Sequence, residues 1–481
     1  MNDILKDIEK MHAELDAQVK NTVNAECRDV LLRYVDKIEN LSEQLGVIAL
    51  KSRSVREDTM LAVSDEIIRV LDGNLHCFEY SQRSKAEQEM YFYDGTHWRK
   101  VGKQDYQDFI VACAERSGLL NYWLAKPNFM NGLFEQTAFR MMGARKNIQP
   151  KKEVWINFQN NTVEIKPDGK LVVREHRRED YFMYVLPYAY DPKATCPKFH
   201  TFLETILPDA STRQLIREYL ASTFEKDFHD ETVLNCVGDG SNGKSTLFFV
   251  LQNLFGEENI SEITLTDLTN NDERRLRIEH KLLNFSEEAD PNIDISMFKR
   301  LASRQAVTVE KKFKDSYEMK DYARIICACN KLPIGENNYA FYRRNILIPF
   351  NVIIPRGEAD KRLRYKLLDE LPGIFNWLIE CLPGLMERQS FSPCQVAEDA
   401  LLEYMDQLDS VRLFYKRCVK SKEYPTPSTE FYSAYSNMCY EENLKREGKT
   451  RFFKKFEQIS RTTRIVGHAN KSSFPFRYQG E

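Results

Sequence analysis

Apolar residues recur at helical spacing in the first part of the chain. Residues 1–75 carry them three or four positions apart, with many charged residues between, as at Ile4, Ile8, Met11 and Leu15. This spacing is typical of amphipathic helices that pack on a neighbour or self-associate. We therefore expect a helical N-terminal segment that contributes to oligomerisation.

The pattern changes to short strand-like runs over residues 76–194. An Asp-Gly turn interrupts the aromatic run from Tyr91 to Trp98, and further short apolar runs begin at Val154 and Thr162. Runs separated by Asn and Asp-Gly turns are typical of antiparallel strands. We expect a mixed α/β domain here.

Helix and strand patterns alternate over residues 195–392, which predicts an α/β domain built on a sheet. In residues 393–481 a helical connector precedes three short helical runs and two strand-like runs. Three helices and a β wing within ~80 residues suggest a winged-helix domain, a variant of the helix-turn-helix scheme. The pattern thus divides the chain into four segments.

Composition fits a multidomain globular protein. A chain of 481 residues, 42% of them hydrophobic and 29% charged, exceeds one ordinary core. No stretch approaches the ~20 apolar residues of a membrane span, and the N-terminus lacks a secretory signal pattern. We therefore expect a cytoplasmic protein without membrane contact. We expect its 11 scattered cysteines to be reduced thiols in the core.

Charge is unevenly distributed. The net charge is −3, yet residues 445–477 hold ten Lys and Arg against two acids, Glu447 and Glu457. A basic module at the end of an acidic chain favours binding of a polyanion. The alternative is a solvated basic face without a partner.

A glycine-rich loop lies between two apolar runs. Gly-Asp-Gly-Ser-Asn-Gly-Lys-Ser follows the strand-like run Val233–Val237 and precedes the helix-like run Leu247–Leu251. Glycines let the backbone direct N–H groups at phosphate oxygens, and the helix N-terminus adds its dipole. We expect Lys244 to reach the β- and γ-phosphates of ATP and Ser245 to hold Mg²⁺. The residues expected to bind nucleotide are Gly238, Asp239, Gly240, Ser241, Asn242, Gly243, Lys244, Ser245 and Thr246.

Two carboxylates follow the next strongly apolar run. Leu282–Glu288 reads as a strand that ends in Glu287 and Glu288. We assign Glu287 to the metal and Glu288 to general base work, although the reverse order fits equally. A strand that merely ends in surface acids is the alternative.

A polar amide and two arginines complete the set. Asn330 ends a buried-type strand, where it would orient the attacking water or contact the γ-phosphate. Arg343 and Arg344 enter a further apolar strand, either as structural ion-pair partners or, as we favour, as an arginine finger. A finger that reaches a neighbour's nucleotide requires a ring. AAA+ type ATPases arrange loop, acidic strand and Asn-ended strand in this order.

A lysine-rich hairpin is predicted between the acidic strand and the Asn-ended strand. Val307 and Val309 alternate before the tip, and Tyr317 and Met319 alternate after it. Lysines around one aromatic suit the phosphates and bases of a single strand, whereas an ordinary exposed hairpin is the alternative. The tip residues are Lys311, Lys312, Phe313 and Lys314.

The ordered set resembles the superfamily 3 helicases, in the branch of phage, plasmid and poxvirus primase-helicases. The resemblance covers roughly residues 91–391, and Trp98 and Tyr190–Pro197 look like the helper region that precedes the ATPase in this branch. The matching motifs are Gly238–Thr246, Leu282–Glu288, Phe298–Met319, Asn330–Pro333 and Arg343–Phe350.

Two departures from the family pattern stand out. The family often has Gly-Gly-Asp in the intervening motif, where this chain has Ala302–Gln305. The first 75 residues are too short for a primase domain. The chain therefore looks like a stand-alone replicative helicase, similar to the replication initiators of staphylococcal pathogenicity islands and chromosomal cassettes.

The resemblance implies an AAA+ type P-loop core in a homo-hexameric ring, with ATP and Mg²⁺ between subunits and 3′ to 5′ movement on single-stranded DNA. It also implies that the C-terminal domain binds a duplex replication origin, with accessory loading or replication proteins as further partners. We expect Arg451, Lys454 and Lys455 to contact duplex phosphates.

Two other functions fit parts of the pattern. One is an origin-binding initiator that ATP switches without processive unwinding. The other is a generic P-loop enzyme such as a small-molecule kinase, which leaves the hairpin lysines and the basic C-terminal module unexplained.

Overall fold

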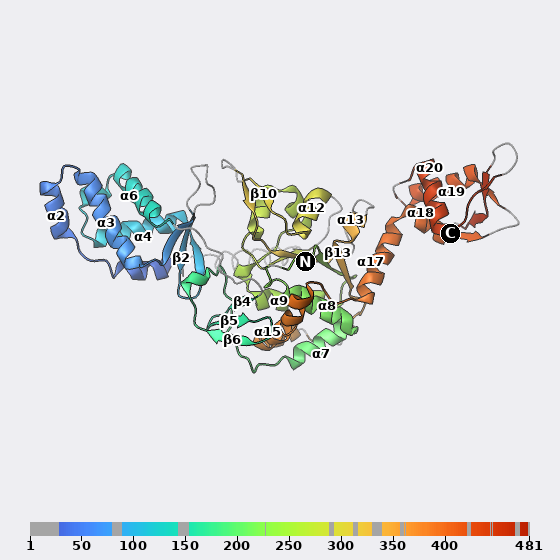
Figure 1. The fold of residues 1–481 in the computed structure, drawn as a ribbon, viewed down its shortest axis with the longest axis horizontal. Coiled ribbons are helices and arrows are strands. Elements are labelled where there is room, and N and C mark those ends of the chain that lie inside the picture. The colour runs from blue at the N-terminus through green and yellow to red at the C-terminus, as the bar shows by residue number, and fades with distance from the viewer. Residues whose placement is uncertain are drawn as a thin grey trace, which may run out of the picture.

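The structure is a computed structural model of the chain. It describes residues 28–78, 89–142, 153–226, 228–287, 293–310, 316–329, 339–355, 360, 362–420, 425–442, 444, 446–466 and 472–479. These residues form three bodies along the long axis of the molecule (Figure 1). We call them the N-terminal body (residues 28–142), the central body (residues 153–394) and the C-terminal body (residues 409–479).

The N-terminal body packs helices against a three-stranded antiparallel sheet of order β1-β2-β3. One hydrophobic core joins Val63 and Ile67 of α3 to Phe109 of α4 and Leu133 of α6. This core therefore includes residues on both sides of position 75, where the sequence pattern changes. Its elements are α2 Ser42–Lys51, α3 Val55–Leu71, β1 Leu75–Phe78, β2 Glu89–Tyr93, β3 Trp98–Val101, α4 Lys103–Arg116, α5 Asn121–Leu124 and α6 Pro127–Arg140.

The second half of the expected mixed domain belongs to a different core. A three-stranded sheet belongs to the core of the central body, where the ring centroids of Phe158 and Phe375 lie 4.6 Å apart. The short strands of residues 76–194 thus divide between two cores. The strands of this sheet are β4 Val154–Asn157, β5 Thr162–Ile165 and β6 Leu171–Arg174.

A five-stranded parallel sheet of order β13-β7-β12-β9-β8 forms the centre of the central body. Side chains alternate between its faces. Ile326 of β12 joins the core under α8, α9 and α15, whereas Ile325 and Cys327 join the core under α12. The strands are β7 Val233–Val237, β8 Ile260–Ser261, β9 Leu283–Glu287, β12 Arg324–Cys329 and β13 Asn345–Pro349.

Helices cover both faces of this sheet, and a hairpin of β10 Val307–Val309 and β11 Tyr317–Met319 lies beside α12 (Figure 1). The alternating pattern of residues 195–392 therefore predicted the class of this fold. The helices are α7 Pro197–Ile206, α8 Ala210–Ala221, α9 Lys244–Phe255, α10 Leu265–Asn270, α11 Asp272–Arg275, α12 Ile295–Ala302, α13 Tyr339–Tyr342, α14 Leu363–Leu368, α15 Leu371–Ile379 and α16 Leu382–Arg388.

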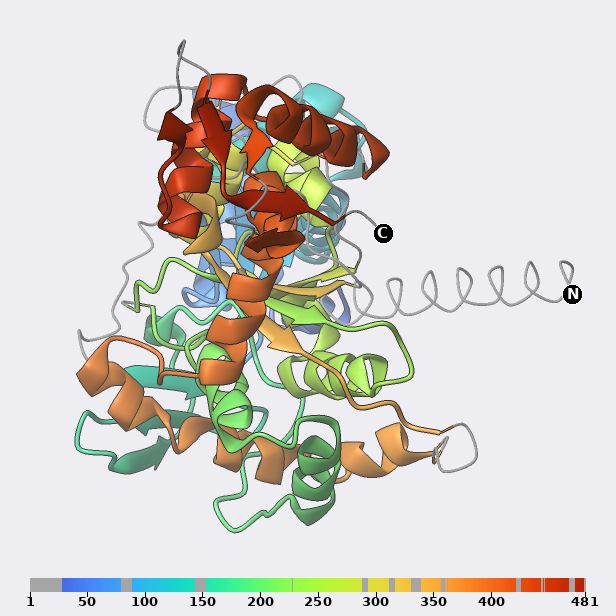
Figure 2. The ribbon, with the colours of Figure 1, turned by 90° about the vertical axis from the view of Figure 1, so that its right-hand side faces the viewer.

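A single long helix, α17 Gln395–Leu408, leads from the sheet to the C-terminal body (Figure 2). Its Leu401 and Tyr404 pack on Cys329 and Leu347 of the sheet. Tyr404 also contacts Tyr342, with ring centroids 6.3 Å apart. The helix is thus seated on the sheet at one end and continues into the C-terminal body at the other.

The C-terminal body has three helices around an aromatic core that includes Phe414, Phe431 and Phe456. Short strands cover it, with the order β15-β17-β16 in one sheet and β14-β18 in the other. The three helices lie where the sequence pattern predicted them. The elements are α18 Ser410–Lys416, β14 Cys418–Lys420, β15 Thr426–Pro427, α19 Ser428–Glu441, α20 Lys449–Ser460, β16 Ile465–Val466, β17 Ser472–Phe474 and β18 Phe476–Tyr478.

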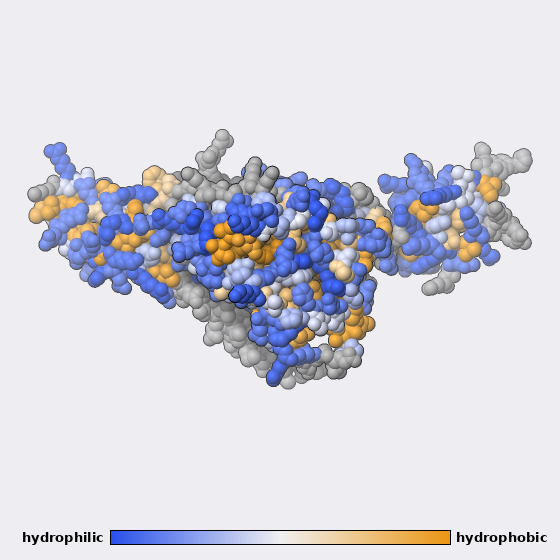
Figure 3. Space-filling view, turned by 60° about the horizontal axis from the view of Figure 1, so that its bottom comes forward, coloured by the Kyte–Doolittle hydropathy of each residue, from blue (hydrophilic) through white to orange (hydrophobic). Residues whose placement is uncertain are grey.

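The surface is mostly hydrophilic, with separated apolar patches (Figure 3). Some of the most exposed apolar side chains are Leu50, Leu120 and Phe139 of the N-terminal body and Tyr440 of the C-terminal body. Among the described helices, none combines the length and the apolar character that crossing a bilayer requires.

Candidate functional site

The glycine-rich loop connects the end of β7 to the start of α9. Three of its residues have positive φ: Gly240 at 99°, Ser241 at 51° and Gly243 at 83°. Glycine adopts such values readily, and a Cβ on Gly243 would lie 2.5 Å from Cγ2 of Ile206. The loop therefore curls tightly and rests on α7.

Backbone hydrogen bonds hold the loop between two strand ends. The Gly238 N–H donates to the Cys329 carbonyl at 3.2 Å, and the Phe350 N–H donates to the Val237 carbonyl at 2.7 Å. Farther along, the Ile354 N–H donates to the Ser241 carbonyl at 2.8 Å. The segment that leaves β13 therefore passes along the loop.

Lys244 is the first residue of α9 and is buried. Its ammonium donates to the Gly238 carbonyl, and burial lowers its pKa from the ordinary value. Ser245, the next residue, is exposed, and Thr246 is half-buried. The helix thus begins with a buried lysine followed by an exposed serine.

Strand register brings the ends of the strands that precede the other expected polar residues to the same end of the sheet. Cys329 pairs with Val237, and Ala328 pairs with Glu287. Asn330 follows Cys329 directly but lies outside the described residues, as do Glu288 and the Glu287 side chain. The carboxyl ends of β7, β12 and β9 therefore lie next to one another, in that order.

Arg343 and Arg344 lie at the amino ends of the strands, whereas the loop lies at their carboxyl ends. They precede β13, whose Asn345 pairs with Val233 at the start of β7. The loop follows the other end of β7, four residues on, a span of about 13 Å at ~3.3 Å per residue. The arginines therefore lie too far along the sheet to be expected at their own chain's loop.

The two arginines share one carboxylate, which sequence reasoning missed. Glu231 Oε2 accepts from Arg343 at 2.8 Å and from Arg344 at 3.0 Å, and Arg344 Nε also donates to Ser303 Oγ at 3.2 Å. The Arg343 side chain is 46% exposed, whereas that of Arg344 is 10% exposed. Only Arg343 is thus available to a neighbour at the surface.

The two strands of the predicted lysine hairpin pair with each other. β10 Val307–Val309 pairs with β11 Tyr317–Met319, so that Val307 lies opposite Met319. The Tyr317 hydroxyl donates to Glu279 at 2.6 Å, which attaches the hairpin to the central body. The tip residues Lys311, Lys312, Phe313 and Lys314 lie outside the described part of the chain.

The expected duplex-binding cations lie on α20 in three different environments. Lys455 forms an ion pair with Asp409 at 2.9 Å, and Asp409 also caps α18 by accepting from the Val411 N–H. Arg451 is 81% exposed and lies 3.8 Å from Glu447. Lys454 is exposed. Lys455 therefore contributes to the fold, and the other two face solvent.

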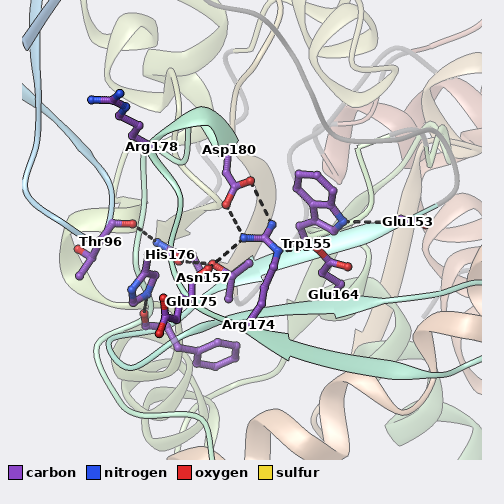
Figure 4. Close-up of polar contacts among 12 residues, drawn as sticks. Thr96, Glu153, Trp155, Asn157, Glu164, Arg174, Glu175, His176, Arg178 and Asp180 are labelled. Atoms are coloured by element: carbon purple, nitrogen blue, oxygen red, sulfur yellow. Dashed lines mark hydrogen bonds and ion pairs between the residues drawn. The ribbon is translucent and has the colours of Figure 1, made fainter. Parts of the chain in front are cut away.

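A polar cluster joins the N-terminal body to the sheet of β4, β5 and β6 (Figure 4). The Arg174 guanidinium donates to both oxygens of Asp180, at 2.7 and 3.1 Å, and lies over Trp155. Asn157 Nδ2 donates to the Thr96 carbonyl of the other body at 2.9 Å. These groups are partners of one another, so the cluster acts as a structural joint.

Comparison with known proteins adds family information to this geometry. Residues 55–208 match the family "D5 N terminal like", and residues 236–344 match a "Family of unknown function (DUF5906)". A protein of Acanthamoeba polyphaga mimivirus, whose name describes it as a putative helicase, is 23% identical over 223 residues. The match covers 44% of this chain and 23% of that protein, so the chain spans about a quarter of its length.

Among solved structures, the apo C-terminal region of NrS-1 superposes with a TM-score of 0.50 at 12% identity. The superposition covers 85% of this chain and 98% of that one. The mixed α/β fold is therefore shared with that region. Together, the matches make the chain similar in sequence to the family "D5 N terminal like" and to a protein named as a putative helicase, and similar in fold to the NrS-1 region.

Proposed function

We propose that the chain is an ATP-dependent replicative DNA helicase with an AAA+ type core of the superfamily 3 kind. The main support is the position of the glycine-rich loop, which connects β7 to α9 where three parallel strand ends meet. In open α/β sheets, ligands bind at the carboxyl ends of the strands. The similarity to a mimivirus protein whose name describes it as a putative helicase supports the same conclusion.

ATP fits the loop in this proposal. Three left-handed backbone positions direct the curl of the loop, and the helix N-terminus behind it favours phosphate. The Lys244 ammonium, now bonded to the Gly238 carbonyl, would exchange this partner for phosphate oxygens. Burial disfavours the charged form of Lys244 and lowers its pKa, whereas a phosphate beside it would favour the charged form.

Mg²⁺ would be held by Ser245 and Glu287, where it would neutralise phosphate charge. Glu288 would take the proton from the attacking water, and Asn330 would orient this water. These roles are proposed from the order of the strand ends. Glu287 and Glu288 could also exchange their two roles.

The arginine positions support a ring. Arg343 is exposed and lies at the end of the sheet opposite its own loop, so it would complete the site of an adjacent subunit. We propose a homo-hexamer with ATP between subunits. Arg344 is buried beside Glu231 and would hold the arginine turn in place.

DNA would meet the protein at two places. The hairpin tip with Lys311, Lys312 and Lys314 would contact one strand in the pore, and ATP hydrolysis would move the protein 3′ to 5′ along this strand. The C-terminal body, proposed as a winged-helix domain, would bind a duplex origin through Arg451 and Lys454.

Unwinding of a forked duplex tests this proposal. The wild-type chain, Lys244→Ala, and the triple variant Lys311→Ala/Lys312→Ala/Lys314→Ala are compared with ATP. We expect both variants to lose strand separation, while the hairpin variant retains ATP turnover. A matched control, Lys170→Ala/Lys193→Ala/Lys198→Ala, removes three exposed lysines of the central body and should unwind normally.

The negative outcomes separate the alternatives. DNA-stimulated ATP turnover without any unwinding would favour an initiator that ATP switches. ATP turnover that DNA does not affect would favour a generic P-loop enzyme and contradict both DNA-based functions.

A further inference from the structure

Asn242 differs from its neighbours in the glycine-rich loop. It is 3% exposed, whereas Asp239, Gly240 and Ser241 are exposed. Its Nδ2 donates to the Phe350 carbonyl at 3.1 Å, across 108 residues of chain. The side chain therefore points into the protein, toward the end of β13, and its amide already has a backbone partner.

The space for this contact depends on the first glycine of the loop. A Cβ on Gly238 would lie 2.3 Å from Asn242 Nδ2 and 2.6 Å from the Phe350 carbonyl oxygen. Both distances are shorter than real Cβ contacts, so any side chain at 238 would push the amide and the carbonyl apart. Gly238 and Asn242 thus form one steric unit with Phe350.

β13 is connected to β7 along its whole length. At its start, the Val233 N–H donates to the Arg344 carbonyl at 2.9 Å. The side chain of Asn235, in the middle of β7, donates from Nδ2 to Oδ1 of Asn345, the first residue of β13, at 3.1 Å. Strand pairing continues from there to Pro349, which lies opposite Val237. β13 is also the edge strand, with β7 as its sole neighbour in the sheet among the described strands.

We propose that Asn242 is a positioning residue, which fastens the glycine-rich loop to the exit of β13. The loop of one subunit and the Arg343 that this subunit presents to its neighbour then lie at the two ends of β13. A change in the loop on nucleotide binding is transmitted to Arg343 through this strand. The last step rests on the proposed function, whereas the fastening itself does not.

Hydrogen exchange in the nucleotide-free protein tests the fastening. The reporter is the segment 350–355, whose Ile354 N–H bonds to the loop. We expect about three- to tenfold faster exchange in Asn242→Ala, the loss of one buried hydrogen bond. Asn242→Asp has the same size but no donor, so it should exchange like the alanine variant. If the residue only fills space, the aspartate variant would exchange like the wild type, which overturns the proposal.

A matched control lies in the same helix as the loop lysine. Asn253 Nδ2 donates to the Phe249 carbonyl of its own helix at 2.8 Å. Asn253→Ala should leave exchange of 350–355 unchanged. Thermal unfolding of each variant verifies that it is folded.

Steady-state kinetics tests the role in turnover. We expect Asn242→Ala to lower kcat about tenfold and to leave the KM for ATP within about threefold, because the loop still offers its phosphate donors. A rise in KM of about tenfold, with kcat and exchange unchanged, would identify Asn242 as a phosphate ligand and overturn the proposal. If the wild type lacks ATP turnover, the proposed function fails, and the exchange measurement still decides on the fastening.

Discussion

At the scale of single residues, neighbours in sequence take different tasks because their burial differs. Arg343 and Arg344 both bond to Glu231, yet one is exposed and the other is held between Glu231 and Ser303. The sequence Arg-Arg cannot show this division, since it depends on Glu231, more than 100 residues earlier.

Complementation between inactive variants tests the proposed finger. Lys244→Ala and Arg343→Ala should each abolish ATP turnover. Mixed together, they should recover part of it, since one interface then combines an intact Lys244 with an intact Arg343. ATP turnover of the mixture is the measurement. A mixture as inactive as its components would contradict a finger that acts between subunits.

Arg344→Ala should act on stability. It removes the better buried partner of Glu231, which we expect to cost about 1 to 2 kcal/mol, less than a fully buried pair because Glu231 is partly exposed. Denaturant unfolding measures this cost, with Arg343→Ala as the matched control. Equal stability of the two variants would contradict the assigned division.

Lys454 and Lys455 offer a similar comparison on α20. Lys454→Ala should weaken duplex binding. It should also reduce the slope of log K against the logarithm of the salt concentration by about one, the amount that one phosphate contact contributes. Lys455→Ala should instead destabilise the C-terminal body, since it breaks the pair with Asp409. Duplex affinity at several salt concentrations is the measurement. A larger binding loss for Lys455→Ala, without loss of stability, would reverse the two roles.

At the scale of elements, local patterns predicted the elements but not their grouping. The alternation at Val307 and Val309 predicted a hairpin, and the structure confirms its two strands. The strand order of the parallel sheet was not predictable, because the intervening helices leave open which strands become neighbours. For the same reason, the partner of Asn242 could not be recognised from its motif.

The N-terminal body shows how tertiary packing overrides a change in local pattern. Residues before position 75 are helical and those after it include strands, yet Ile67 lies in the same core as Phe109. A periodicity change marks a change of element, whereas a domain boundary depends on which apolar faces meet.

A substitution in α3 tests this shared core. Ile67→Ala should cost about 2 to 4 kcal/mol and speed hydrogen exchange in α4 and α6. The parallel sheet of the central body should keep its exchange rates. Leu61→Ala, at a position 43% exposed on the same helix, is the control. If Ile67→Ala speeds hydrogen exchange only in residues before position 75, the residues on the two sides of this position form two separate cores.

At the scale of the whole molecule, α17 connects the sheet to the C-terminal body. Its Leu401 and Tyr404 pack beside Val237 and Cys329, the residues just before the glycine-rich loop and Asn330. Tyr404 also contacts Tyr342, which precedes Arg343. One helix therefore packs close to the residues that directly precede the glycine-rich loop, Asn330 and Arg343.

A flexible Gly-Ser insertion after Leu408 tests this connection. The wild type should bind duplex DNA with different affinities in the presence and absence of a nonhydrolysable ATP analogue, by the 5- to 150-fold that couplings of about 1 to 3 kcal/mol produce. The insertion should remove this difference and retain both ATP turnover and duplex binding. An unchanged difference would contradict coupling through α17.

The regular geometry of α17 has a further consequence for how the chain can vary in length. An α-helix turns about 100° per residue, so one added residue between the sheet contacts and α18 would swing the C-terminal body by about that angle. Seven added residues would bring it back to within about 20° of its original direction, roughly 10 Å farther out. We therefore expect the number of helical turns, more than the number of residues, to decide which insertions and deletions this helix tolerates, so relatives whose C-terminal body keeps the same orientation should differ here by near-whole turns.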